Sequence, residues 1–267
     1  MKKVSVIITS FNKGKFLNEC INSVKNQSYQ NLEIILIDDC STDSYTIGIL
    51  KELENDNQIN IFKLTENKGV SNARNFGIKN STGEYILIVD GDDKISDTYI
   101  EKAVKIIESD SEYKIVSCEV ELFGYYHGKM PLAKPEIEYL IAQNALIISS
   151  LFRKSDFEKT SGFNENMKEG LEDWDFWLSI LEKGGKVYRI PEVHFYYRIS
   201  KKSRNNLDFE KLRRLRKQIY ENHKELYSKY LLDPINSFEY TLLKNSKEYR
   251  LGKFLLKPLR IIFDKFL

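Results

Sequence analysis

Residues 85–93 read YILIVDGDD, and this stretch decides the fold. Tyr85–Val89 is a continuous apolar run, a pattern typical of a strand buried on both faces. Three carboxylates follow at once, on Asp90, Asp92 and Asp93, and they repel one another unless a cation or hydrogen-bond donors hold them. Mn²⁺ and Mg²⁺ prefer such oxygen ligands. The turn could also be a simple exposed acidic turn, but its place directly after a buried strand favours a metal site.

On either side of this stretch, apolar runs alternate with segments of helical periodicity. This order predicts an α/β fold with a mostly parallel sheet and helices on both faces. The other expected strands are Val4–Thr9, Leu32–Ile37 and Ile59–Leu64, and the expected helices are Phe16–Gln27, 47–53 and Val70–Lys79.

Polar residues follow the predicted strands where a ligand crevice is expected, beyond the carboxyl ends of a parallel sheet. Thr9 and Phe11 follow the first strand, and the Phe11 ring could stack on a base or simply pack. Asp39 follows the second strand, where it could accept hydrogen bonds from a nucleobase or ribose. Asp43 is suited to cap the next helix. These residues predict a nucleotide site.

Two further clusters carry charged groups at expected helix starts. In residues 67–75, NKGVSNARN, Arg74 could pair with a phosphate or with the acidic turn. Glu172 and Asp173 open the expected helix Trp174–Leu181. A helix cap is the simpler interpretation of these carboxylates, but the neighbouring aromatic residues could keep one of them basic.

The second half is less regular, and four strands and one long helix are expected in it. A basic loop follows the last strand, and its Arg198 and Ser203 could close over a diphosphate or remain a solvated loop. The expected strands are Ile115–Phe123, Ala145–Phe152, Val187–Ile190 and His194–Arg198, and the helix is Phe209–Tyr230, with a break at Asp233-Pro234.

Composition favours a single domain with an appendage, and the motifs place the domain at residues 1–203 and a helical extension at residues 204–267. The chain has 267 residues, 42% of them hydrophobic, which is enough for one sizeable core. The three cysteines are scattered, as expected for free thiols in a reducing compartment. The apolar run Val4–Ile8 is too short for a signal peptide, and no stretch is long enough to span a bilayer. A cytoplasmic protein is predicted.

The extension is basic and amphipathic. Residues 201–267 hold 17 Lys and Arg against 8 Asp and Glu. In Leu251–Leu267, seven apolar residues fall on one helical face and basic residues on the other, a pattern typical of a helix lying on an anionic membrane. The same face could instead pack on the body of the protein. We predict a peripheral site on the inner face of the cell membrane and no nucleic-acid partner, since only the net charge would favour one.

Taken together, the motifs resemble the family 2 glycosyltransferases of the GT-A fold over residues 4–203. The resemblance implies a metal-dependent, inverting transfer of a sugar from a nucleotide-diphosphate donor, a UDP-sugar, to a glycan or lipid-linked glycan acceptor, with Mn²⁺ or Mg²⁺ as cofactor. The motifs that carry it are VSVIITSFN, IILIDDCSTD, NKGVSNARN, GEYILIVDGDD, GFNE, GLEDWDFWLSILEKGG and YYR.

The resemblance also implies individual roles. Asp90 and Asp92 match the metal-binding pair, with Asp92 the direct ligand and Asp93 beside it. Asp173 matches the catalytic base, supported by Glu172. The positions that match the nucleotide site are Thr9, Phe11, Asp39, Arg74 and Asp90. Ile199-Ser200 follow Arg198 where family members often carry a histidine, so the completion of the diphosphate site stays open.

Two other functions compete with this one. A sugar nucleotidyltransferase would also use acidic residues on an α/β sheet, but it usually needs a glycine-rich phosphate loop, and Asn12–Lys15 is too slight for one. A non-catalytic module that binds nucleotides or glycans on the same scaffold is the third reading. The presence of both Asp92 and Asp173 argues against it.

Overall fold

The computed structural model describes residues 1–200, 208–230 and 238–263. The chain forms two compact units, Met1–His223 and Lys224–Leu267. The helix α8, Phe209–Asn222, belongs to the first unit. The predicted boundary between residues 203 and 204 lies outside the described residues, and the division into a catalytic domain and an extension stays a prediction.

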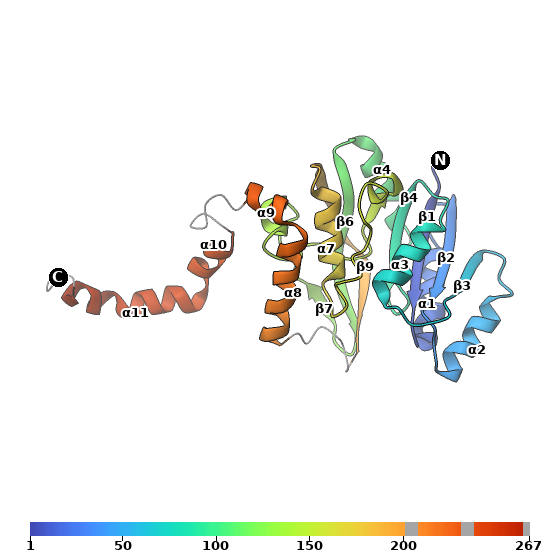
Figure 1. Cartoon of the computed structure of the whole chain (residues 1–267), viewed down its shortest axis with the longest axis horizontal. Coiled ribbons are helices and arrows are strands. Elements are labelled where there is room, and N and C mark those ends of the chain that lie inside the picture. Colours follow the sequence, from blue (N-terminus) through green and yellow to red (C-terminus); the bar gives the residue numbers. More distant parts are fainter. Residues whose placement is uncertain (201–207, 231–237, 264–267) are drawn as a thin grey trace. The chain divides into compact units, whose positions relative to one another are not determined.

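The first half of the sheet is parallel, as predicted (Figure 1). The strand β1 lies in the middle, between β2 and β4, and pairs Thr9 with Asp90 at its carboxyl end. The four strands of this half are β1 Val4–Ser10, β2 Leu32–Asp38, β3 Ile59–Lys63 and β4 Tyr85–Asp90.

The second half is mixed. Among the described residues the sheet has nine strands, in the order β3-β2-β1-β4-β8-β6-β9-β5, with β7 beside β6. The pair β6 and β9 is parallel, whereas β8 joins β4 and β6 in antiparallel fashion. The bounds are β5 Lys94–Ile95, β6 Tyr113–Gly124, β7 Gly128–Met130, β8 Leu151–Arg153 and β9 Lys186–Ile199.

Two strand predictions are corrected. The apolar run Ala145–Phe152 is a strand only in β8, because a buried turn precedes it, in which Ser150 Oγ donates to the Ile147 carbonyl. An apolar run shows burial but not its backbone conformation. The predicted strands Val187–Ile190 and His194–Arg198 are one strand, β9, which continues past Pro191 through a shift in register. Proline in a strand is tolerated at such irregularities.

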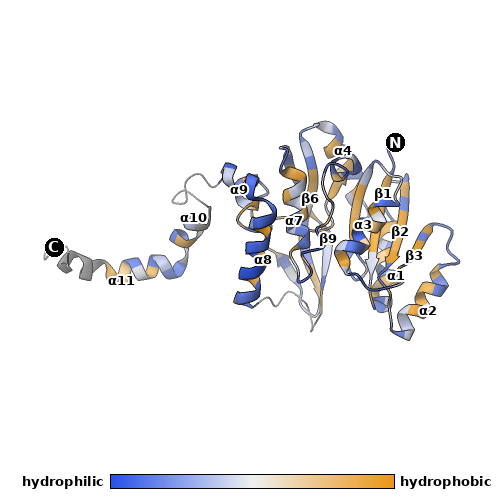
Figure 2. Ribbon diagram, viewed as in Figure 1, coloured by the Kyte–Doolittle hydropathy of each residue, from blue (hydrophilic) through white to orange (hydrophobic). Residues whose placement is uncertain are grey.

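Helices cover both faces of the sheet (Figure 1). Apolar residues of α1, α2 and α4 pack with alternate residues of β1 on one face. On the other face, a Cβ on Gly77 of α3 would lie 2.5 Å from Ile7, and aromatic rings of α7 contact Phe152 of β8. Figure 2 shows the apolar strands between these helices. The bounds are α1 Gly14–Lys25, α2 Ser44–Leu53, α3 Val70–Lys79, α4 Tyr99–Ser109, α5 Ile137–Leu140, α6 Lys154–Phe157 and α7 Glu172–Leu181.

The second unit is helical in its described part. It contains α9 Lys224–Tyr230, α10 Phe238–Asn245 and α11 Lys247–Phe263. The predicted helix Phe209–Tyr230 is therefore two helices, α8 and α9, which separate at His223 because the backbone there leaves helical geometry. The predicted break at Asp233-Pro234 lies outside the described residues. Of the helices described, none combines the length and the apolar character needed to cross a bilayer.

Candidate active site

Arg74 joins the two acidic clusters. It lies on α3 and is 2% exposed. Its Nη2 donates to both oxygens of Asp90, at 3.0 and 3.1 Å, and its Nη1 donates to Glu172 at 2.9 Å. The hydroxyl of Thr9 donates a further hydrogen bond to Asp90 at 2.9 Å. Because Asp90 ends β4 and Glu172 begins α7, one guanidinium brings the acidic turn and the helix start to the same side of the sheet.

The charges of this cluster determine the protonation of Asp90. Burial disfavours the charged carboxylate, but the Arg74 guanidinium and the hydrogen bonds from Arg74 and Thr9 outweigh burial and lower the pKa of Asp90. Asp90 and Glu172 in turn raise the pKa of Arg74 above its ordinary value, against the effect of burial. The cluster therefore keeps Asp90 ionised and its position fixed.

Asp173 stands in the first turn of α7 with an unusual affinity for a proton. Its Oδ2 accepts a hydrogen bond from Asn144 at 2.9 Å, and its Oδ1 accepts the Trp174 N–H at 2.8 Å. Burial, followed by the negative charge of Glu172, raises the pKa of Asp173 to about 6. A carboxylate with a pKa near neutrality is suited to general-base catalysis. Leu171, the N-cap residue of α7, supplies no side-chain cap, and Asp173 itself accepts an N–H of the first turn, so this carboxylate also serves the helix start.

The start of α7 is held by neighbouring loops. Leu171 has a left-handed backbone, with φ of 60°, a conformation that costs a non-glycine residue about 1–2 kcal/mol. The Trp174 indole donates to the Leu140 carbonyl at 2.6 Å. The Phe163 ring, from the GFNE motif, stacks on Phe176 with centroids 4.0 Å apart. These contacts fix the direction in which Asp173 faces.

The acidic turn contains a second, separate arrangement. Asp92 is 18% exposed and forms an ion pair with Lys13. Asp93 is 2% exposed, and its Oδ1 accepts the Arg198 N–H at 2.8 Å. Burial, followed by the charges of Asp90 and Asp92, raises the pKa of Asp93 well above its ordinary value. The turn thus holds two partly exposed carboxylates, Asp90 at 29% and Asp92 at 18%, and one buried carboxyl group.

These donors fit a hard divalent ion. Asp92 offers an accessible carboxylate, and the buried Oδ2 of Asp93 has no hydrogen-bond partner within the described part of the chain. In that same part, no three His, Cys, Asp or Glu residues gather as a metal-binding cluster. Mg²⁺ commonly takes only one or two carboxylates and completes its shell with water and substrate phosphates. The metal roles of Asp90, Asp92 and Asp93 stay predictions.

Arg198 closes the edge of the site from β9. Its Nε donates to the Asp92 carbonyl at 2.8 Å, and its guanidinium pairs with Glu19. The guanidinium carbon lies 4.3 Å from the Phe16 ring centroid and 4.2 Å from that of Phe123. Arg198 thus stands beside the acidic turn, with its role toward a diphosphate still a prediction. Ser203 lies outside the described residues.

The predicted nucleotide residues lie at the ends of β1 and β2. Asp39 is 4% exposed and accepts the N–H groups of Lys68 and Gly69, at 3.1 and 3.0 Å. It therefore holds the loop that enters α3 and keeps lone pairs for another donor. Phe11 is half-buried at the end of β1. The predicted cap is confirmed, since Asp43 accepts the Thr46 N–H at 2.9 Å.

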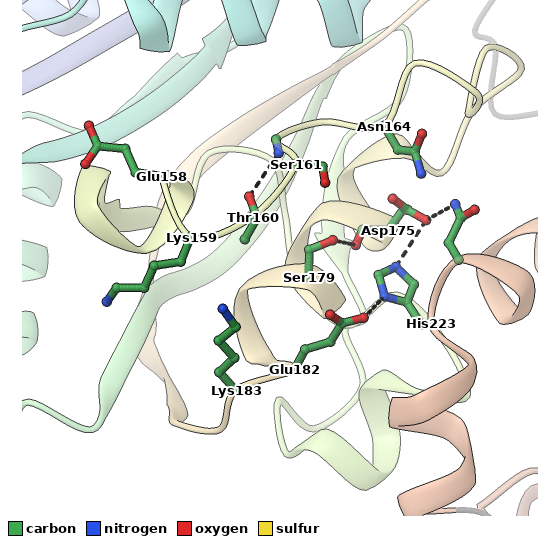
Figure 3. Close-up of a pocket in the computed structure, with 12 residues that line it drawn as sticks. Glu158, Lys159, Thr160, Ser161, Asn164, Asp175, Ser179, Glu182, Lys183 and His223 are labelled. Carbon is green, nitrogen blue, oxygen red and sulfur yellow. Dashed lines mark hydrogen bonds and ion pairs between the residues drawn. The ribbon is translucent and has the colours of Figure 1, made fainter.

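A separate pocket lies beside α7, at Asp175 and Glu182 (Figure 3). It has a volume of about 370 Å³, and Asp175 and His223 lie on its wall. Its lining, within the described residues, includes none of the predicted catalytic, nucleotide or metal residues. The predicted site instead gathers at the carboxyl edge of the sheet, around Arg74 and the Asp90 turn.

The sequence of the protein matches the model of the family described as glycosyl transferase family 2 over residues 5–174. The chain belongs to this family. Membership confirms the predicted family and shows that the protein is a glycosyltransferase. It favours transfer of a sugar over the nucleotidyl transfer that the sequence left open.

Bacterial glycosyltransferases are similar along most of the chain. TuaG of Bacillus subtilis (strain 168), named for teichuronic acid biosynthesis, is 33% identical over 205 residues, which cover 73% of this chain and 79% of TuaG. EpsE of the same organism, named as a glycosyltransferase, is 30% identical over 203 residues, which cover 73% of each chain.

Solved structures confirm the GT-A fold. The structure of S. aureus TarS 1–349 in complex with UDP-GlcNAc has a TM-score of 0.67 at 18% identity, covering 93% of this chain and 77% of TarS 1–349. The mannosyltransferase PcManGT of Pyrobaculum calidifontis, in complex with GDP-Man and Mn²⁺, has a TM-score of 0.61 at 18% identity, covering 94% of this chain and 83% of that one.

Sequence reasoning missed two residues that contact the candidate site. Asn144 donates to Asp173 from an irregular loop before β8, where no periodicity marks its position. Lys13 pairs with Asp92 from the loop before α1. The polar run Asn12–Lys15, which is too slight for a phosphate loop, is the one sequence feature that marks Lys13.

Proposed function

We propose that this protein transfers a sugar from a UDP-sugar to an acceptor hydroxyl with inversion, in the synthesis of a bacterial polysaccharide. The observation that carries the proposal is the single Arg74 side chain bound to both Asp90 and Glu172, because it sets the acidic turn and the candidate base around one place. The name of TuaG and the UDP-GlcNAc bound to TarS support the pathway and the donor.

The nucleotide would bind at the ends of β1 and β2. Phe11 offers a ring face for uracil, and Asp39 has free lone pairs for an N–H or ribose hydroxyl. Thr9 and Arg74 would act through Asp90, which they hold ionised and in place. Arg198 stands beside the turn and would meet the diphosphate, together with Ser203 from the following loop.

Asp173 is the proposed general base. The acceptor hydroxyl is a weak nucleophile until its proton is removed, and a positioned base contributes about two to four orders of magnitude in rate. Asn144 orients the carboxylate, and burial together with the negative charge of Glu172 raises its pKa to about 6. One base facing the donor supports a single displacement at the anomeric carbon, which inverts its configuration.

The acidic turn would hold the divalent ion. We propose Asp92 as the direct ligand, with Asp93 beside it, and Asp90 would add negative charge from the end of β4. Lys13 would then leave Asp92 for the phosphates of the donor. When bound, Mn²⁺ or Mg²⁺ neutralises the charge that develops on the departing nucleotide diphosphate. The Mn²⁺ in the PcManGT complex supports this choice.

A panel of donors tests the proposal. UDP-GlcNAc, GDP-mannose and dTDP-glucose are each incubated with the full chain, Mn²⁺ and mixed glycan acceptors, and release of the nucleoside diphosphate is followed. We expect release from a UDP-sugar that depends on acceptor and is lost in Asp92→Asn. Lys129→Gln, an exposed change on β7, is the control for handling and folding. Release from none of the donors, under conditions where the protein is folded, would reject catalysis and leave the binding module.

A further inference from the structure

The helix α11 exposes large apolar side chains on one face. Leu251, Phe254 and Leu255 are 58%, 74% and 61% exposed. Their spacing of three and four residues places them together along the helix. Figure 2 shows hydrophobic and hydrophilic segments alternating along α11. An apolar face of this size usually marks a surface that meets another apolar phase.

Basic side chains gather beside this face. Residues 238–263 contain six Lys and Arg against two Asp and Glu. Between α10 and α11 lies a groove of about 530 Å³, with Lys244, Arg250 and Lys253 on its wall. Tyr249 and Phe254 also line it, so the groove joins the basic residues to the apolar face. Such a groove suits a phosphate with an attached acyl or isoprenoid chain.

We propose that the consecutive helices α10 and α11 form a membrane-binding element for anionic phospholipid. The face of Leu251, Phe254 and Leu255 enters the acyl boundary of the bilayer. The groove of Lys244, Arg250 and Lys253 takes the phosphate of a lipid headgroup. Apolar burial and attraction to anionic lipid add together in elements of this kind. The proposal does not depend on the donor or acceptor of the transferase.

Vesicle flotation of the full chain tests both parts of the element. We expect the protein to float with vesicles of phosphatidylcholine and phosphatidylglycerol and to remain behind with phosphatidylcholine alone. The triple variant Lys244→Gln, Arg250→Gln and Lys253→Gln should bind about a hundredfold more weakly, since each basic residue near an anionic surface contributes about fivefold. The double variant Phe254→Asp and Leu255→Asp should lose flotation.

Matched controls separate this element from general charge and apolarity. The triple variant Lys51→Gln, Lys79→Gln and Lys129→Gln removes the same charge from exposed positions of the first unit, and it should float like the unaltered protein. Phe209→Asp removes an aromatic ring that is 77% exposed on α8, and it should also float.

Two results would overturn the proposal. One is equal flotation of the groove variant and the unaltered protein. The other is no flotation of the unaltered protein with either lipid, together with a lower unfolding temperature for Phe254→Asp and Leu255→Asp. The second result would show that this face packs on protein instead of lipid.

Discussion

At the scale of the residue, Arg74 is a buried positive charge that holds two partly exposed carboxylates, Asp90 and Glu172. It is 2% exposed and pairs with two carboxylates from elements far apart in sequence. The guanidinium carbon of Arg74 also lies 5.4 Å from the centroid of the Phe163 ring. A buried ion pair adds little net stability, but the loss of one partner leaves an uncompensated charge. Arg74 therefore determines both the shape and the electrostatics of the site.

Replacing Arg74 by methionine should destabilise the protein by about 1–3 kcal/mol, because Asp90 and Glu172, which are partly exposed, would lose their shared hydrogen-bond donor and repel each other. Urea unfolding followed by circular dichroism measures the change. The exposed substitution Lys79→Met on the same helix is the matched control and should change stability by less than about 0.5 kcal/mol. Equal stability of the Arg74 variant and the unaltered protein would show that the cluster is not a buried charge network.

The activity of the enzyme should depend on pH through Asp173. Burial and Glu172 raise its pKa to about 6, and a base works only when deprotonated. The plot of kcat/KM against pH should therefore fall as pH drops through about 6 and level off above it. In Arg74→Lys, which keeps a positive charge, the acid limb should stay near its position. If kcat/KM instead fell only near the ordinary pKa of an aspartate, the base would not be a carboxylate buried beside Glu172.

One contact of the candidate site could be predicted, that of Arg74 with the acidic turn, but its contact with Glu172 could not. The positions of Asp90 and Asp92 directly after a buried strand mark them in the sequence, whereas the role of Asp173 follows from the resemblance to the family. That Arg74 binds Asp90 and Glu172 together depends on the packing of α3 and α7 on one face of the sheet. No local pattern encodes such a contact. Asn144 was missed for the same reason.

At the scale of the element, hydrogen bonds of a buried histidine link α7 to the end of α8 (Figure 3). His223 is 3% exposed, and its two ring nitrogens lie 3.2 Å from Asp175 and 2.6 Å from Glu182. Asn222 donates to the same oxygen of Asp175 at 2.6 Å. Because α7 also carries Asp173, these hydrogen bonds help to hold in place the helix of the proposed base.

His223 should make stability depend on pH. Burial opposes its positive charge, but hydrogen bonds to Asp175 and Glu182 outweigh burial and raise its pKa above 6.5. The stabilisation is complete below the unfolded pKa and is lost as pH rises through the raised folded pKa. His223→Gln should therefore cost about 1–3 kcal/mol at about pH 6 and less at about pH 9. Chemical denaturation at the two pH values measures it, and a cost that grows with pH would contradict the account.

Elements with continuous apolar runs were predictable, since both faces of a central parallel strand are buried and β1, β2 and β4 show no alternation. The helix α4 was missed, although Tyr99, Ile100, Ala103, Val104 and Ile107 have helical spacing and are buried. It begins at Tyr99, a few residues after the acidic turn, and its helical spacing is visible in the sequence. The strand β5 has two residues and depends wholly on its pairing with β9.

At the scale of the whole molecule, ligand and metal should act together on the first unit. A ligand at about a hundred times its Kd stabilises a protein by about 2.7 kcal/mol, which is roughly 5–10 °C for a unit of this size. UDP with Mn²⁺ should therefore raise the unfolding temperature more than UDP alone. In Asp92→Asn the increment due to Mn²⁺ should vanish while that due to UDP remains. A thermal shift with and without chelator measures both, and an unchanged Mn²⁺ increment would remove Asp92 from the metal site.

The most direct measurement compares binding and chemistry in Asp173→Asn. Calorimetry gives the affinity for UDP, and a single-turnover assay gives the rate of sugar transfer. We expect the affinity to stay within about twofold and transfer to fall by about two to four orders of magnitude, since the amide cannot take up the acceptor proton. Transfer at the full rate in Asp173→Asn would contradict the account.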